Sequence, residues 1–184
     1  EVEVTARGEP REGKVLAAKA RQETSIYNAI ELASGRMART GRDGVIAGAL
    51  GRRKALRGFV GEIPETLKVG DRLHVLNLGG VLGVVVSGTP DVGKPLLCEV
   101  LGAVDRGGEP ATITRELPPA PAKLPDVPLV LVEGTCMSAG KTQAAATIIG
   151  KLSQRGYRVH GCKLTGVACL KDTLNMEDHG AKRT

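Results

Sequence analysis

Nine consecutive residues in the last third of the chain combine glycines, small side chains, a lysine and a hydroxyl group. They read GTCMSAGKT and run from Gly134 to Thr142. A triphosphate needs many hydrogen-bond donors in a small volume, and backbone N–H groups supply them where small residues let the chain curl closely. Lys141 can reach the β- and γ-phosphates, and the Thr142 hydroxyl can ligate Mg²⁺. The pattern predicts a phosphate-binding loop (P-loop) for a nucleoside triphosphate.

The predicted loop has an unusual length. The standard pattern, G-x-x-x-x-G-K-[ST], would place its first glycine at Thr135, but here the glycine is one residue earlier. The alternative is an ordinary glycine-rich turn between a strand and a helix. The Gly-Lys-Thr triplet and the flanking patterns favour the phosphate loop. We expect the nucleotide to contact all nine residues: Gly134, Thr135, Cys136, Met137, Ser138, Ala139, Gly140, Lys141 and Thr142.

The elements around the loop are predicted from periodicity. Leu129–Val132 is a continuous apolar run, typical of a strand buried on both faces of a parallel sheet. The sequence predicts a helix over Lys141–Arg155, with a left-handed cap at Gly156 and a second strand over Tyr157–Cys162. Strand, loop, helix and strand make one βαβ unit. The apolar face of the helix would contain Ala144, Ile148 and Leu152.

Loops of the form G-T-x-x-x-x-G-K-T resemble those of the dethiobiotin synthetase family and its relatives, the cobyrinic and cobyric acid synthases. Downstream, residues 161–166 (GCKLTG) resemble the family's GY-K-P-x-x-S-G stretch. This likeness implies that Lys163 lies near the phosphates and acts in catalysis together with Lys141. Residues 175–178 (NMED) resemble the family's N-S-D segment, which implies that Asp178 helps Thr142 hold Mg²⁺.

The resemblance covers residues 129–184 and has departures. Cys136 stands where dethiobiotin synthetase has Asp, and Leu164 replaces a proline. It implies an Mg²⁺-dependent, ATP-binding ligase that phosphorylates a carboxylate or carbamate, with a small-molecule second substrate whose identity stays open. Two alternatives remain. One is a nucleotide-dependent regulatory ATPase or GTPase with a β effector domain, and the other is a nucleic-acid-binding β-barrel fused to an ATPase.

A proline-rich segment divides the chain. Residues 117–128 (LPPAPAKLPDVP) contain five prolines, which predict an extended interdomain linker. Before it, residues 1–116 show short apolar stretches broken by glycine, and these predict a small, mostly β domain, a barrel or a sandwich. After it, residues 129–184 predict the start of a P-loop parallel-sheet domain in an α/β fold. Such a domain normally needs five or more strands and two are visible, so we expect it to be incomplete or completed by other means.

The composition of the chain limits the classes of partner that we expect. The net charge of +6 suits an anionic ligand, whereas 2% aromatic residues speak against base stacking with nucleic acid. No apolar run approaches the ~20 residues of a membrane span, and four cysteines without a C-x-x-C pair favour reduced thiols. We therefore expect a cytoplasmic protein without membrane partners. A homodimer and the choice between ATP and GTP are left open.

Other segments receive simpler interpretations. Gly88–Pro95 mimics the loop, but Pro95 replaces the hydroxyl residue, so we predict a β-hairpin loop there. Tyr27–Met37 suits either a short helix or a hairpin. His160 is expected in the core, and a site role for His179 and for the Cys136 thiol stays open. A basic cluster is expected to be a solvated loop: Arg52, Arg53, Lys54 and Arg57.

Overall fold

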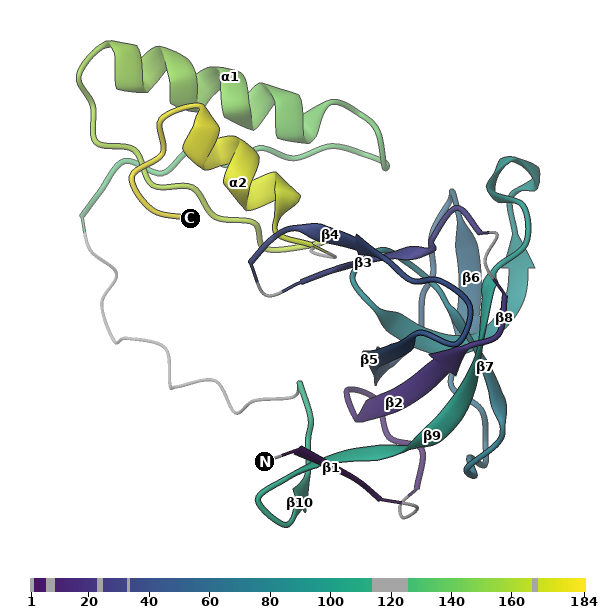
Figure 1. The fold of residues 1–184 in the computed structure, drawn as a ribbon. Coiled ribbons are helices and arrows are strands. Elements are labelled where there is room, and N and C mark those ends of the chain that lie inside the picture. Colours follow the sequence, from purple (N-terminus) through teal and green to yellow (C-terminus); the bar gives the residue numbers. More distant parts are fainter. Residues whose placement is uncertain (1, 6–8, 23–24, 33, 114–125, 167–168) are drawn as a thin grey trace. The chain divides into compact units, whose positions relative to one another are not determined.

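The computed structural model describes residues 2–5, 9–22, 25–32, 34–113, 126–166 and 169–184. They belong to two compact units, residues 1–116 and 117–184, which are described one at a time (Figure 1). The division falls where the proline-rich segment begins. Residues 117–125 of that segment lie outside the described residues, so the linker stays a prediction.

The described part of the N-terminal unit consists of short strands and one 3-10 turn, Pro90–Val92. The strands are β1 (Val2–Thr5), β2 (Val15–Ala20), β3 (Ala29–Glu31), β4 (Met37–Arg39), β5 (Val45–Leu50), β6 (Phe59–Glu62), β7 (Arg72–Val75), β8 (Val81–Gly88), β9 (Leu96–Arg106) and β10 (Glu109–Pro110). This confirms the prediction of a mostly β N-terminal unit.

Strand pairing closes a ring in the order β9, β2, β5, β8, β7 and back to β9. The β5–β8 contact is parallel, and the other four contacts are antiparallel. β1 and β10 extend the ring through β9, and β6 extends it through β8. The choice between barrel and sandwich stays a prediction.

The core of this unit follows the alternation of its strands. In β5 every second residue is buried, and β9 shows the same alternation over most of its length. The side chains that point inward are mostly leucine, alanine and valine, in keeping with the scarcity of aromatic residues. The largest buried side chains of this core are Leu16, Leu50, Leu73, Leu82, Leu96, Val75 and Cys98.

For two segments of this unit, Tyr27–Met37 and Gly88–Pro95, the predicted local structure can now be compared with the observed one. Tyr27–Met37 forms a hairpin rather than a helix, with Gly35 at φ +78° in the turn between β3 and β4. Gly88–Pro95 contains the 3-10 turn between β8 and β9, and no α-helix follows it. The prediction of a hairpin there is wrong, because β8 and β9 both pair with β7 instead of with each other.

In the C-terminal unit the predicted helix is present as α1 (Lys141–Gln154). It ends as predicted, because Gly156 has φ +85° and the N–H of Tyr157 donates to the Leu152 carbonyl at 3.1 Å. The predicted apolar face is only partly right: Ile148 and Leu152 are half-buried, but Ala144 is exposed. The buried residues of α1 are Ala146 and Ile149, and Ile149 packs against the second helix described below.

The two predicted strands of this unit are extended segments without strand pairing among the described residues. Leu129, Val130 and Leu131 are 87%, 60% and 63% exposed, so their prediction as a strand buried on both faces is wrong here. A buried parallel strand needs neighbours on both sides, and the described unit supplies none. Both extended segments nevertheless run in the same direction, opposite to α1, as in a βαβ unit (Figure 1).

A second helix, α2 (Lys171–Asp178), was not predicted. Its end repeats the geometry of α1: Gly180 has φ +103°, and the N–H of Ala181 donates to the Met176 carbonyl at 3.0 Å. Met176 and Ala181 form a small core with Ile149 of α1. Neither of the two described α-helices has the length and apolar character that a membrane span requires.

Candidate functional site: the loop before helix α1

The loop between Gly134 and α1 is an exposed series of turns. Two of its residues have left-handed backbones: Ser138 with φ +63° and Gly140 with φ +84°. A left-handed conformation is unusual for serine, and it tightens the turn that leads into the helix. Turns of this kind let successive backbone N–H groups point to one side, which is the geometry of an anion-binding concavity.

Lys141, the first residue of α1, folds back over the loop. Its ammonium donates a hydrogen bond from Nζ to the carbonyl oxygen of Cys136 at 2.6 Å. The aliphatic stem of Lys141 passes over Gly134, where an added Cβ would lie 3.0 Å from Cγ and 3.1 Å from Cδ. Glycine at position 134 therefore makes room for the lysine, which is a physical reason for the unusual spacing of the loop.

The first turn of α1 faces the loop without a side-chain cap. Its first α-helical backbone bond runs from the N–H of Ala144 to the Gly140 carbonyl, at 2.9 Å. The N–H groups of the preceding helical residues have no partner within a helix, and the helix dipole adds positive potential at this end. Thr142 is half-buried in the same turn. The loop, the Lys141 ammonium and the uncapped start of α1 are thus all hydrogen-bond donors within one short segment.

Lys163 follows the second extended segment and pairs with a residue that the sequence analysis missed. Its Nζ lies 2.8 Å from Oδ2 of Asp172, in the first turn of α2. The two side chains are 20% and 21% exposed. This ion pair depends on how α2 packs in the folded unit. The sequence offers only a weak signal for it, namely an acidic residue at the start of a segment with helical propensity.

Asp178 lies at the opposite end of α2. The next residue, His179, lies against Gly150, where an added Cβ would be 3.8 Å from the His179 carbonyl oxygen. Gly150 is about 12 Å of helical rise beyond Thr142. The structure does not bring Thr142 and Asp178 together. The described residues contain no group of three or more His, Cys, Asp or Glu that could hold a metal ion.

The other candidates do not converge on the loop. His160 is exposed, so its predicted place in the core is wrong. His179 interacts through Nδ1 with the Asn175 carbonyl at 2.7 Å, near the end of α2. Cys136 is exposed within the loop and contributes its backbone carbonyl to the contact with Lys141.

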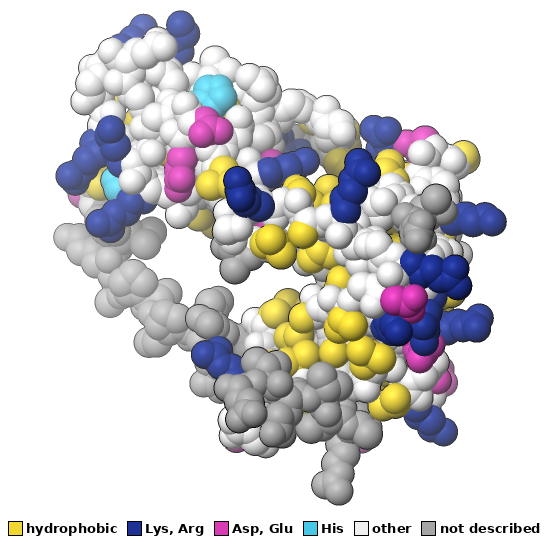
Figure 2. Space-filling view, in the orientation of Figure 1, with side chains coloured by type: hydrophobic (Ala, Val, Ile, Leu, Met, Phe, Trp, Pro, Cys, Tyr) yellow, Lys and Arg dark blue, Asp and Glu magenta, His cyan; other side chains and the backbone are white. Residues whose placement is uncertain are grey.

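Two of the four residues in the basic cluster form ion pairs within the N-terminal unit. Arg52 forms ion pairs with Glu12 and Glu62, at 3.1 and 3.0 Å. Arg57 pairs with Asp91 at 2.8 Å, and hydrogen bonds from Thr89 and then Arg57 lower the pKa of that carboxyl. Basic and acidic side chains of this unit lie side by side at the right of Figure 2. These pairs leave less free positive charge for a polyanion.

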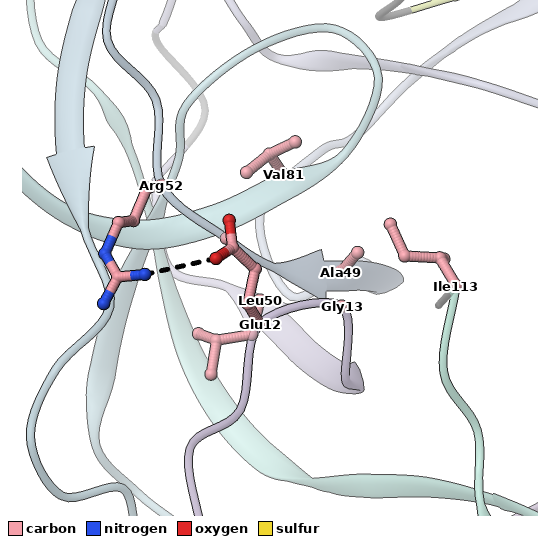
Figure 3. Close-up of a pocket in the computed structure, with 8 residues that line it drawn as sticks. Glu12, Gly13, Ala49, Leu50, Arg52, Val81 and Ile113 are labelled. Atoms are coloured by element: carbon pink, nitrogen blue, oxygen red, sulfur yellow. Dashed lines mark hydrogen bonds and ion pairs between the residues drawn. The ribbon is translucent and has the colours of Figure 1, made fainter. Parts of the chain in front are cut away.

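A shallow pocket in the N-terminal unit has a volume of about 260 Å³ (Figure 3). Apolar residues line most of it, including Leu50, Val81 and Ile113. Its charged residues, Glu12 and Arg52, are joined by a 3.1 Å ion pair that Figure 3 marks. Since the charges neutralise each other, the pocket offers little to an anionic ligand.

The chain matches no protein-family model, no curated protein and no solved structure. A functional assignment therefore depends on the residues and their geometry.

Proposed function

We propose that the C-terminal unit binds a nucleoside triphosphate through residues 134–142, with ATP as the nucleotide that the family resemblance implies. The observation that carries this proposal is the Lys141 ammonium, which bonds the Cys136 carbonyl within a loop bent by two left-handed residues. Its charge is held over the loop, where the uncapped helix start also points its N–H groups.

The chemistry of this arrangement suits the β- and γ-phosphates. An ammonium has three donors, and one of them is used by the Cys136 carbonyl. The others remain for phosphate oxygens, and the backbone N–H groups around Ser138 and Gly140 add neutral donors. In phosphoryl transfer the protein contributes mainly position and charge neutralisation. A lysine fixed at the helix start contributes to both.

The resemblance also implies Mg²⁺ held by Thr142 and Asp178. A hydroxyl and a carboxylate are suitable oxygen ligands. Thr142 lies beside the loop, whereas Asp178 lies near the second half of α1. As a pair they do not fit one ion in this structure, so we derive no step through the metal, and the Asp178 assignment stays a prediction.

For the reaction, we propose the ligase chemistry of the family that the loop resembles. The γ-phosphoryl group would pass to a carboxylate or carbamate, and a nitrogen nucleophile would then displace phosphate. Lys141 and Lys163 would stabilise the charge on the transferred group. The test is phosphate release, which should require a carboxylate- or carbamate-bearing second substrate. Steady release without one would favour a nucleotide-dependent regulator.

The binding proposal is tested with Lys141→Ala. We expect the variant to lose the ATP-induced thermal shift, with affinity reduced at least about tenfold, because charge-assisted hydrogen bonds are lost. Lys151→Ala is the matched control, since Lys151 is an exposed lysine in the last turn of the same helix. Circular dichroism checks that both variants are folded. An undiminished ATP-induced shift in Lys141→Ala would show that the loop is not the site.

A further inference from the structure

The two helices of the C-terminal unit start at the same end. Contacts pair the end of α2 with the second half of α1: Ser153 Oγ donates to the Gly180 carbonyl at 3.0 Å, and His179 lies against Gly150. One turn earlier, Met176 packs with Ile149. The residue numbers of the paired positions decrease together along both helices, so the two helices run in the same general direction. Figure 1 shows both beginning on the same side of the unit. The start of α2 therefore lies on the same side of the unit as the start of α1.

The segment that carries Lys163 returns toward this side. It leaves α1 at Tyr157, and seven extended residues from there to Lys163 span roughly 20 Å. α1 has 14 residues and is about 21 Å long. The segment is thus long enough to run back along the whole helix, and Figure 1 shows that it does. The segment that ends in Lys163 therefore returns toward the side of the unit on which α1 begins.

Asp172 holds Lys163 at the end of this segment. The carboxylate and the ammonium are 2.8 Å apart, and both side chains are about four-fifths buried although much of this unit is exposed. The preceding chain segment packs closely on α2, because an added Cβ on Gly161 would lie 2.7 Å from Sδ of Met176. The chain segment before Lys163 therefore lies directly against α2, and the pair is part of this contact.

From these contacts we propose that Asp172 is a positioning residue of the nucleotide site and that it acts through Lys163. The inference rests on the proposed function, because it needs a triphosphate in the loop. A lysine side chain is flexible, and fixing it only on binding would cost affinity. A carboxylate that takes one of its three donors fixes it beforehand and leaves the others for phosphate oxygens. Asp172 is then an acidic residue that serves the site through Lys163.

Inorganic tripolyphosphate in EDTA is a suitable probe, since it excludes base recognition and any metal. We expect Asp172→Asn to bind it roughly fivefold more weakly, which corresponds to about 1 kcal/mol. Asp172→Glu should recover part of the affinity. Glu177→Gln, which neutralises an exposed carboxylate on the same helix, should bind like the wild type. Equal or tighter binding by Asp172→Asn would overturn the proposal. Tighter binding is expected if the Asp172 carboxylate only neutralises the charge of Lys163, because its removal would leave the site more positive for an anion.

A double-mutant cycle separates positioning from a general effect on folding. In the Lys163→Ala background, Asp172→Asn should cause no further loss, whereas an additive loss would overturn the proposal. Failure of the wild type to bind the probe, or full binding by Lys141→Ala, would remove the proposed function itself. Binding that needs Lys141 but is indifferent to Asp172 would remove only this inference.

Discussion

Gly134 lies directly under the side chain of Lys141, with space for a hydrogen but not for a methyl group. An added Cβ would be 3.0 Å from Cγ of the lysine, a distance that forces the lysine stem to move. The stem carries the ammonium that bonds the Cys136 carbonyl, so a change at position 134 is transmitted to the charge that we place on the phosphates.

The first prediction concerns this contact. Gly134→Ala should weaken ATP binding moderately, because a flexible stem can shift by a few tenths of an ångström. Gly134→Val should weaken it by roughly tenfold or more, since the ammonium can no longer keep its position. Calorimetric titration measures both. Gly41→Ala is the control, because an added Cβ there meets nothing within 4 Å. Wild-type affinity in Gly134→Val would contradict the geometry of the loop.

The second prediction uses the cysteines as reporters. Cys136 and Cys162 are exposed, and we expect iodoacetamide to alkylate both at pH 8. ATP should protect Cys136, which lies in the loop, and leave Cys162 unprotected. Cys98 should resist throughout, because burial raises its pKa to about 11 and keeps the thiol protonated. Mass spectrometry of the peptides gives all three rates. Equal labelling of Cys136 with and without ATP would count against nucleotide in the loop.

The third prediction concerns acid stability of the N-terminal unit. Burial lowers the pKa of His74 below its usual value near 6.5, partly offset by a hydrogen bond with the Gly83 backbone. Nδ1 accepts the N–H of Val85 at 3.3 Å, which also requires the neutral ring. As pH falls through about 6.5, the unfolded chain binds the proton first, so the folded state loses stability.

The test compares unfolding of the wild type and His74→Gln in urea between pH 7.5 and pH 5. Glutamine offers an acceptor but does not titrate in this range. The wild type should lose stability relative to the variant on acidification. Parallel pH dependence of the two proteins would mean that His74 does not contribute.

Features that depend on a few neighbouring residues were predictable from the sequence. The start of α1 at Lys141 and the left-handed Gly156 that ends it are set by local backbone geometry, and both are confirmed. The mostly β character of residues 1–116 also follows from short apolar runs and frequent turns. The glycine at position 35 could have decided between a helix and a hairpin, because a helix interior disfavours glycine.

Features that depend on distant partners were not predictable. The buried face of α1 includes Ile149 rather than Ala144, because α2 packs against that side. The ion pair of Lys163 with Asp172 requires the return of the chain along α1 and the placement of α2. Leu129–Val132 has the composition of a buried strand, but its burial depends on neighbouring strands that the described residues do not include.

The strand ring of the N-terminal unit has a consequence for the order of folding. β9 pairs with β2 and places Leu16 opposite Ala103. These two residues are neighbours in the sheet but lie near opposite ends of the unit's sequence. A nascent chain can bring β2 and β5 together as soon as both have emerged, but the ring waits for β9. We therefore expect the early strands to spend part of synthesis with open edges, whereas the backbone hydrogen bonds of α1 are local and can form as soon as its residues emerge.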